Sequence, residues 1–334
     1  MSREHHSISI HFIRTLVASA KRNGIDEQKL LRFAGLNESL LANPGLRVTA
    51  DQLSRTMQEF WREADDEFMC MGSQPSRHGV FTLMAKQAVR CKNLHAVYHH
   101  LGHFYNLVAE ALTLDFSIVE DEVRFSFCLK EPDIDQDKTL REFLLLLWHR
   151  FPSWLVGQLI PLKYVTLDYS EPEHSAEHKL MYPCSVRYNQ PSNMLVFDAK
   201  LLDEPVVQTP VTLSAYLRRA PLDWFKRQAY YPVFTRKVMD YLENEQELAT
   251  THMDEIAKEL HLTSRTLRRK LDMEGTSFQE LKDDVRRDAA IHYLSQPSIP
   301  ISEISRKLGF SEPAAFTRAF KQWTGVPPGI YRRS

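Results

Sequence analysis

The chain has 334 residues and a formal net charge of −1, with charged residues making up 25% of the sequence. This length suggests about two domains, and the balanced charge excludes binding to nucleic acid through overall basicity, so a DNA-binding function has to rest on local charge. Cys70, Cys91, Cys128 and Cys184 are scattered without a CxxC pair, which excludes a disulfide framework and a zinc-binding cysteine motif.

The first hundred residues are predicted to be mainly helical. Apolar spacing indicates helices over residues 25–33, 49–61, 80–89 and 94–108, with Thr49 as the N-cap of the second helix.

We expect neither a signal peptide nor a membrane span. Residues 1–16 carry charges early and lack a long apolar core. The most apolar window, residues 143–160, is interrupted by His149, Arg150 and Pro152, whereas a membrane span needs about 20 mostly apolar residues. Residues 140–147 are therefore expected to form a buried helix.

A β-hairpin follows the first helices. The stretch "LTLDFSIVEDEVRFSFCL", residues 112–129, alternates apolar and polar residues on both arms around a polar turn at residues 120–122. A helix over about 137–158, a strand over 164–169, a helix over 174–181 and extended segments over 185–189 and 194–197 come next. Strands and helices mix without a strict βαβ order, which predicts an α+β fold.

The C-terminal part is predicted to be entirely helical. Residues 201–210 contain two prolines and no apolar period, which indicates the end of the first domain. The predicted domains are residues 1–210, a helical linker at 211–230, and an all-helical domain at 231–334.

The all-helical domain contains an internal repeat. "MDEIAKELHLTSRTLRRKL", residues 253–271, aligns with "ISEISRKLGFSEPAAFTRAF", residues 301–320, at a shift of 48 residues, with one extra residue in the second copy. Leu267 and Leu271 in the first copy match Phe316 and Phe320 in the second. Each pair is four residues apart, so we expect each pair to face the core.

Each copy has the pattern of a helix-turn-helix motif, over about 251–275 and 299–325. Ala257 and Ser305 are small where two helices have to cross, Gly309 suits a left-handed turn, and Pro313 suits the first turn of a helix. Side chains able to cap the second helices come just before or at their start: Thr263, Ser264 and Ser311.

The second helix of the first motif is strongly basic. Arg265, Arg268, Arg269 and Lys270 cannot all face inward beside the apolar pair. They therefore form a local cationic surface suited to phosphates and to guanine edges. Between the copies, residues 277–295 read as a rigid spacer helix that begins with a Ser277–Glu280 capping box. A separation of about 34 Å would place the two second helices in successive major grooves.

Residues 231–334 resemble the DNA-binding domain of the AraC/XylS family of bacterial transcription regulators. The resemblance is carried by "GFSEPAAFTRAFKQWTG", residues 309–325, followed by the pattern P-x-x-Y-R. The N-terminal part resembles the family branch with an arabinose-binding-type sensor domain, through "LLRFAGL" at 30–36, "YPCSVRYNQPSNMLVFDAKLLDEP" at 182–205 and the helix-then-hairpin order. This second resemblance implies a domain that binds an effector and mediates dimerisation, and it names no ligand.

The candidate DNA-binding residues lie on the second helix of each motif: Ser264, Arg265, Thr266, Arg268, Arg269, Lys270, Ser311, Ala314, Ala315, Thr317, Arg318 and Lys321. Among them the resemblance assigns base reading to Arg265, Arg268, Arg269, Ala314, Ala315, Thr317 and Arg318. The Ala-Ala pair departs from the family pattern, because alanine offers thymine a methyl contact and no hydrogen bond.

Other residue clusters favour structural roles. His95, His99 and His103 share one helix face, and His174 and His178 repeat the same spacing of four residues. A polar helix face is favoured over a metal site in both places. The acidic runs at 63–68 and 132–137 are expected to be solvated turns, and no Gly-rich phosphate loop or GxSxG motif is present. We therefore expect no catalytic residue, no cofactor and no metal.

The sequence thus predicts a cytoplasmic, non-enzymatic regulator that binds double-stranded DNA. Its expected partners are a second copy of the chain, an unknown small-molecule effector and, as a further candidate, RNA polymerase; no membrane partner is expected. Two alternatives stay open: an N-terminal domain that only mediates dimerisation or protein interaction, and an enzyme with a DNA-binding tail.

Overall fold

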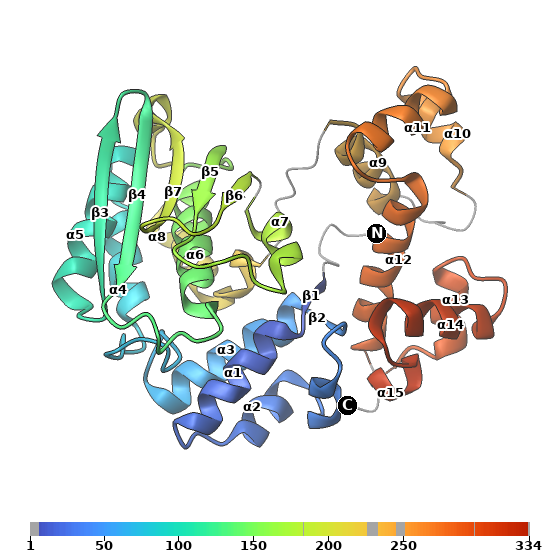
Figure 1. Ribbon diagram of the computed structural model, residues 1–334, viewed down its shortest axis with the longest axis horizontal. Helices are drawn as coiled ribbons and strands as arrows, with labels where there is room; N and C mark the ends of the chain where they lie inside the picture. The colour runs from blue at the N-terminus through green and yellow to red at the C-terminus, as the bar shows by residue number, and fades with distance from the viewer. Residues whose placement is uncertain (1–6, 183, 226–232, 245–250, 297, 333–334) are drawn as a thin grey trace. The chain divides into compact units, whose positions relative to one another are not determined.

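The computed structural model describes residues 7–182, 184–225, 233–244, 251–296 and 298–332 (Figure 1). The contacts divide the chain into two compact units. The larger unit holds His11–Ala34 and Leu53–Gln228, and the smaller unit holds Met1–Ile10, Gly35–Gln52 and Ala229–Ser334. Two N-terminal segments thus cluster with the C-terminal helices, and the limits at 210 and 231 stay a prediction.

The larger unit is built on a five-stranded sheet with the strand order β3-β4-β7-β5-β6. The strands are β3 (Leu112–Val119), β4 (Glu122–Leu129), β5 (Leu162–Thr166), β6 (Ser185–Arg187) and β7 (Asn193–Asp198). Neighbours are antiparallel except β5 and β6, which are parallel. Together with the helices of this unit, the sheet confirms the predicted α+β class.

The predicted hairpin is present, with β3 and β4 paired from Leu112↔Leu129 to Val119↔Glu122. Alternate β4 residues are buried, as the period of two predicts. On β3 the alternation fails near the turn, where Ile118 is 47% exposed. The tip of the hairpin therefore carries apolar residues outside the core.

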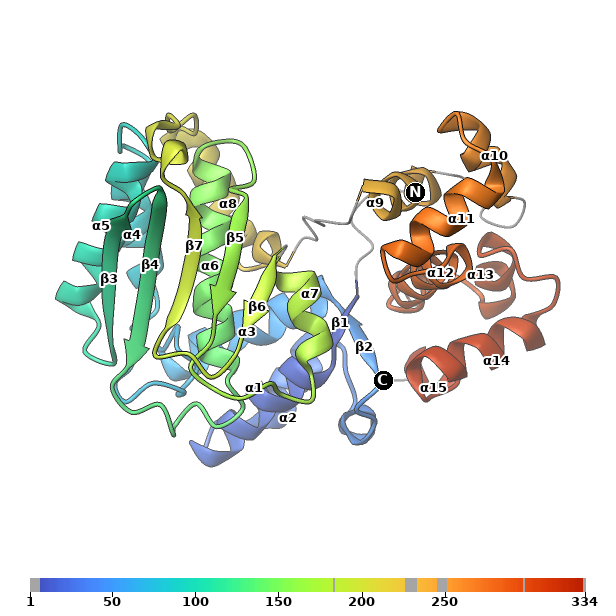
Figure 2. The ribbon, with the colours of Figure 1, turned by 45° about the horizontal axis from the view of Figure 1, so that its top comes forward.

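Helices cover one face of this sheet (Figure 2). The helices of this unit are α1 (His11–Arg22), α2 (Glu27–Ala34), α3 (Ala50–Ala64), α4 (Val80–Ala88), α5 (Leu94–Val108), α6 (Thr139–Leu155), α7 (His178–Met181) and α8 (Pro210–Arg219). Three 3-10 helices join them: η2 (Ser175–Glu177), η3 (Ala199–Asp203) and η4 (Leu222–Trp224). The start of α3, before Leu53, is counted with the smaller unit.

Helix α6 is the centre of the larger unit, because almost all of its side chains are buried. It packs on β7, and its Trp148 meets the rings of Phe125 and Phe127 on β4 at 5.7 and 5.0 Å. The predicted buried helix over 140–147 is therefore confirmed. Among the described residues, no helix combines the length and the hydropathy that crossing a bilayer would require.

The expectation that the two acidic runs are solvated turns was wrong for Asp66 and Asp135, which are 2% and 1% exposed. Asp66 accepts hydrogen bonds from three backbone amides. Asp135 accepts hydrogen bonds from two backbone amides and from the buried Arg141 guanidinium. Each carboxylate turns inward because it satisfies backbone donors that would otherwise be buried without partners; for Asp135 these lie in the first turn of α6.

The predicted linker is helical and packs into the larger unit as far as Phe225. Tyr216 of α8 stacks on Trp154 at 4.3 Å, and Trp224 meets Phe81 at 5.3 Å. Residues 226–230 of the predicted linker lie outside the described residues.

The smaller unit contains α9 (Val233–Asn244), α10 (Met253–Glu259), α11 (Ser264–Met273), α12 (Phe278–Leu294), α13 (Ile301–Lys307), α14 (Pro313–Thr324) and α15 (Pro328–Arg332). A two-stranded sheet of β1 (Ser7–Ser9) and β2 (Arg47–Thr49) and the 3-10 helix η1 (Glu38–Ala42) complete it. The Tyr331 hydroxyl donates a hydrogen bond to the Arg47 carbonyl at 3.2 Å. Figure 1 shows α10 and α11 near one end of α12, and α13 and α14 near the other end.

Candidate DNA-binding surface

The inner face of α11 is fixed by an apolar cluster shared with its neighbours. Leu267 and Leu271 are 0% and 1% exposed and belong to the same cluster as Ile256 and Ala257 of α10. Helices α9 and α12 complete the cluster with Val238, Met239, Leu242, Leu281 and Val285. This packing confirms the predicted inward pair and directs the three arginines of α11 toward solvent.

The turns of the two motifs have matching backbone geometry. His261 has a φ of 54° and Gly309, at the equivalent position, has a φ of 77°. In each copy the next residue donates a backbone hydrogen bond to the carbonyl five residues earlier, at 2.8 Å in the first and 3.0 Å in the second. The prediction for Gly309 is confirmed, and His261, which the repeat aligns with Gly309, has the same left-handed backbone, which histidine adopts more often than most non-glycine residues.

Thr263, rather than Ser264, caps α11. The Thr263 hydroxyl accepts a hydrogen bond from the Thr266 backbone amide at 3.2 Å. The Ser264 hydroxyl instead donates to the carboxylate of Asp254 on α10. Thr266 is half-buried. Ser264 and Thr266 thus lie at the edge of the candidate surface, engaged in local contacts.

Three arginines of α11 point into solvent. Arg265 and Arg269 lie one turn apart, opposite the buried leucine pair, and Arg268 lies beside them. All three are exposed, and no residue in the described parts of the chain forms a hydrogen bond or ion pair with them. Their guanidinium donors are therefore available to an external partner.

Lys270 faces the opposite flank of α11, toward α9. Its ammonium nitrogen lies 4.2 Å from the centroid of the Phe234 ring. Glu274 lies near it and accepts hydrogen bonds from the backbone amides of Phe234 at 3.1 Å and Thr235 at 2.7 Å. Burial by itself would raise the pKa of Glu274, but these bonds and the charge of Lys270 lower it. Lys270 therefore helps to hold α11 on α9.

The outer face of α14 carries less charge than that of α11. Phe316 and Phe320 are both 0% exposed, which confirms their predicted inward position. The exposed side of the helix presents Ala314, Arg318 and Lys321. The two other candidates on this helix, Ala315 and Thr317, are half-buried. The Thr317 hydroxyl donates a hydrogen bond to the Pro313 carbonyl at 2.9 Å.

The predicted cap by Ser311 was wrong. Glu312 is the N-cap residue of α14, its side chain makes no capping bond, and Pro313 opens the helix. The extra residue of the second copy places Glu312, rather than Ser311, directly before Pro313 and therefore at the N-cap position. Ser311 is exposed at the end of the turn.

Helix α12 is the predicted spacer. Ser277 and Glu280 form the expected capping box, with the Ser277 amide donating to Glu280 at 2.8 Å and the Glu280 amide to the Ser277 hydroxyl at 3.3 Å. The helix has 17 residues, so it is about 25 Å long. It therefore spans most of one turn of B-DNA, which is about 34 Å.

Comparisons with known proteins match both parts of the chain. The family model described as the arabinose-binding domain of AraC transcription regulators, N-terminal, matches residues 24–206, and a helix-turn-helix domain model matches residues 256–334. The ornithine utilization regulator of Pseudomonas aeruginosa is 23% identical over 332 residues, covering 98% of this chain and 96% of the relative. The urease operon transcriptional activator of Escherichia coli is 40% identical over 81 residues, 24% of this chain and 27% of that one. The crystal structure of the regulator CdpR from Pseudomonas aeruginosa aligns with 96% of this chain and 97% of its own, at 20% identity and a TM-score of 0.34.

The N-terminal match alone covers more than half of the chain, and the C-terminal match covers α11 to α15 in full. Two helix-turn-helix motifs joined by a capped spacer helix are what the sequence repeat predicted. The chain therefore belongs to the AraC family of DNA-binding transcription regulators.

Proposed function

We propose that this regulator reads its operator chiefly through Arg265 and Arg269 of α11, while Arg318 and Lys321 of α14 mainly hold the DNA backbone. The observation that carries the proposal is the exposed, unpaired state of the α11 arginines among the described residues. A side chain that is already held by an intramolecular ion pair would have to break it before contacting a base.

The position of each cation on α11 suggests its role. Arg265 and Arg269 lie at the centre of the exposed face, so both guanidinium groups reach deepest when α11 enters a major groove. A bidentate contact from arginine to the O6 and N7 atoms of guanine contributes about 1–3 kcal/mol of discrimination. Arg268 and Lys270 lie on the two flanks, where phosphates are the nearer partners. The family resemblance assigned base reading to Arg268 as well. We propose that Arg268 contributes less to base recognition than Arg265 and Arg269.

The second motif offers fewer hydrogen-bond donors. Ala314 and Ala315 provide methyl groups for thymine, and the hydroxyl of Thr317 is bonded to its own helix. Arg318 and Lys321 are the exposed cations of this face. We therefore propose that α14 contacts mainly the DNA phosphates. Such contacts position the protein on the DNA and carry little sequence information.

Salt-dependent binding of full-length protein tests this division. Lys321→Ala is expected to weaken binding to the operator and to random DNA alike, and to reduce the slope of log K against log salt by about one. Gln322→Ala is the matched control, since Gln322 is an exposed neutral residue of the same helix. A Lys321→Ala protein with an unchanged salt slope and an altered site preference would contradict the proposal.

The N-terminal region is proposed to bind a small polar effector and to mediate homodimerisation in the cytoplasm. The match to an arabinose-binding domain over residues 24–206 supports effector binding. One relative is named for ornithine utilization, so sugars and amino acids are both effector classes to test. The effector would shift the equilibrium between two arrangements of the regulator, and RNA polymerase is the proposed partner at the promoter.

Thermal melting of the full-length protein with single metabolites tests the effector proposal. A ligand at one hundred times its Kd is expected to stabilise the folded protein by about 2.7 kcal/mol. Arabinose, ornithine and representative sugars and amino acids form the first panel. If no metabolite class shifts the melting temperature while the protein still dimerises, the N-terminal region is a dimerisation module without an effector. Turnover of a metabolite would instead indicate an enzyme.

A further inference from the structure

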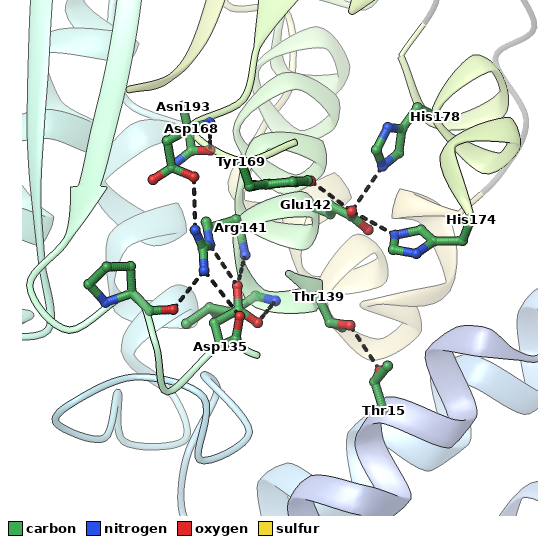
Figure 3. Close-up of polar contacts among 12 residues, drawn as sticks. Thr15, Asp135, Thr139, Arg141, Glu142, Asp168, Tyr169, His174, His178 and Asn193 are labelled. Atoms are coloured by element: carbon green, nitrogen blue, oxygen red, sulfur yellow. Dashed lines mark hydrogen bonds and ion pairs between the residues drawn. The ribbon is translucent and has the colours of Figure 1, made fainter. Parts of the chain in front are cut away.

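A buried polar cluster in the larger unit gathers around the carboxylate of Glu142 on α6. Its side chain is 0% exposed, and its Oε1 atom lies 2.8 Å from His174 Nε2 and 2.9 Å from His178 Nε2 (Figure 3). The Tyr169 hydroxyl donates to the same oxygen at 2.8 Å. Three separate segments, namely α6, the residues after β5, and η2 with α7, thus converge on one oxygen atom.

The other carboxylate oxygen of Glu142 is buried, and no described residue forms a hydrogen bond with it. Leaving a buried acceptor unsatisfied costs about 1–3 kcal/mol, and more for a charged group. One oxygen of Glu142 thus has three partners, whereas the other has none among the described residues.

The two imidazoles are oriented by further contacts. His178 Nδ1 bonds with the Tyr188 hydroxyl at 2.8 Å, so Nε2 is the nitrogen that faces Glu142. The His174 ring stacks on His11 at 3.8 Å between centroids. Histidines that bind metals commonly hold the second ring nitrogen in a hydrogen bond of this kind, which fixes the tautomer and the ring direction.

We propose that Glu142, His174 and His178 form a binding site for a divalent transition-metal ion of the zinc type. The three ligand atoms lie within 4.8 Å of one another, and among the described residues this is the one group of three or more His, Cys, Asp or Glu side chains with such geometry. Two imidazoles and one carboxylate form a donor set found in zinc sites. The imidazoles select against magnesium and calcium, which prefer oxygen ligands.

Two of the three ligand separations are shorter than a tetrahedral zinc ion requires. Tetrahedral zinc with bonds of about 2.0–2.1 Å holds its ligand atoms about 3.3 Å apart. The Glu142–His174 and Glu142–His178 separations are 2.8 and 2.9 Å, so each imidazole would move away by about 0.5 Å. Three protein ligands would leave a fourth position for water or another ligand. The ion would fasten the short η2–α7 segment to the central helix of the unit.

The histidines of α5 provide a matched control within the same chain. His95, His99 and His103 have the same spacing of four residues and are exposed, but they do not belong to a three-ligand group among the described residues. Substitutions there remove a helical histidine pair without touching the proposed site.

Metal titration of the untagged full-length protein, first stripped with a chelator, tests the proposal, with Co²⁺ as the probe and Zn²⁺ as its competitor. We expect one ion per chain, a visible absorption band of four-coordinate cobalt, and displacement by zinc. Glu142→Gln and His174→Ala should weaken binding at least tenfold, whereas His99→Ala should leave it unchanged. His174 lies at the edge of the cluster, with a side chain 10% exposed, so circular dichroism of His174→Ala shows that lost binding is not lost folding.

Two results would overturn the proposal. One is a wild-type protein that takes up no stoichiometric ion, in which case the cluster is a buried ion-pair network. The other is binding that survives in Glu142→Gln and His174→Ala but is lost in His99→Ala, which would assign the ion to the exposed face of α5.

Discussion

Replacing Phe320 by alanine tests whether the apolar side of α14 stabilises the second helix-turn-helix motif. Phe320 is 0% exposed, and its ring meets those of Phe316 and Tyr331 at centroid distances of 5.8 and 5.7 Å. Deleting such a ring removes buried apolar surface and leaves a cavity, which costs about 3–5 kcal/mol. For a region of about 100 residues, this corresponds to a fall in melting temperature of roughly 12 °C or more.

The measurement has to resolve the C-terminal helices from the larger unit. Hydrogen exchange of the full-length protein, followed peptide by peptide, does so. In Phe320→Ala we expect lost protection across α13, α14 and α15 and unchanged protection in α6. The exposed Gln322→Ala control should stay within about 0.5 kcal/mol of wild type. Unchanged protection in Phe320→Ala would show that the ring is not part of a core, and the assignment of the helix faces would be wrong.

Two further predictions concern single side chains. Thr263→Ala should lower the free energy of unfolding by about 1 kcal/mol because it removes the α11 cap, whereas Ser311→Ala should have little effect; equal losses in urea denaturation would contradict the assigned caps. Burial, together with the charge of Arg150, lowers the pKa of His149 to about 3, so below about pH 6.5 the unfolded chain takes up a proton that the folded chain does not. Stability should therefore fall as the pH drops below that value, with this histidine contributing up to about 1.4 kcal/mol per pH unit. His149→Gln should make the fall in urea midpoint between about pH 7 and pH 5 less steep, and identical slopes in both proteins would refute this pKa.

Much of the fold was predictable because its signals are local. In the hairpin at 112–129, apolar and polar residues alternate along consecutive positions. The start of the spacer helix is indicated by the Ser277–Glu280 capping box. The two helix-turn-helix motifs share an apolar spacing that the repeat makes visible twice. In all these cases the residues that determine the local structure lie within a few positions of one another. The sequence pattern therefore indicates directly which residues interact.

The buried polar contacts could not be predicted, since they join distant residues. Glu142 meets His174 and His178 across 32 and 36 positions, and nothing in the spacing of an isolated glutamate indicates such a partner. Asp135 was expected in a solvated turn because its neighbours are acidic, yet its carboxylate accepts hydrogen bonds from two amides in the first turn of α6. The cap by Ser311 failed for a smaller reason, namely that one inserted residue moved the helix start.

The existence of the candidate DNA-binding surface could be predicted from the sequence, but the position of each basic side chain on it could not. The sequence located the basic residues of α11, and the buried leucine pair fixed which side they face. The separate position of Lys270 depends on Phe234 of α9, which lies 36 residues away in the sequence. Only the packed structure shows that Arg265 and Arg269 occupy the centre of the exposed face.

The most direct test of our central claim, that α11 reads bases through Arg265 and Arg269, is selection of binding sites from random DNA by full-length wild type, Arg269→Ala and Lys270→Ala. We predict a defined site for wild type and a loss of preference at one or two base pairs in Arg269→Ala, worth about 1–3 kcal/mol or roughly 5- to 150-fold in affinity. Lys270→Ala should keep the wild-type site. If Arg265→Ala and Arg269→Ala both select the wild-type site, and only substitutions in α14 alter it, the claim is contradicted and α14 is the helix that reads the sequence.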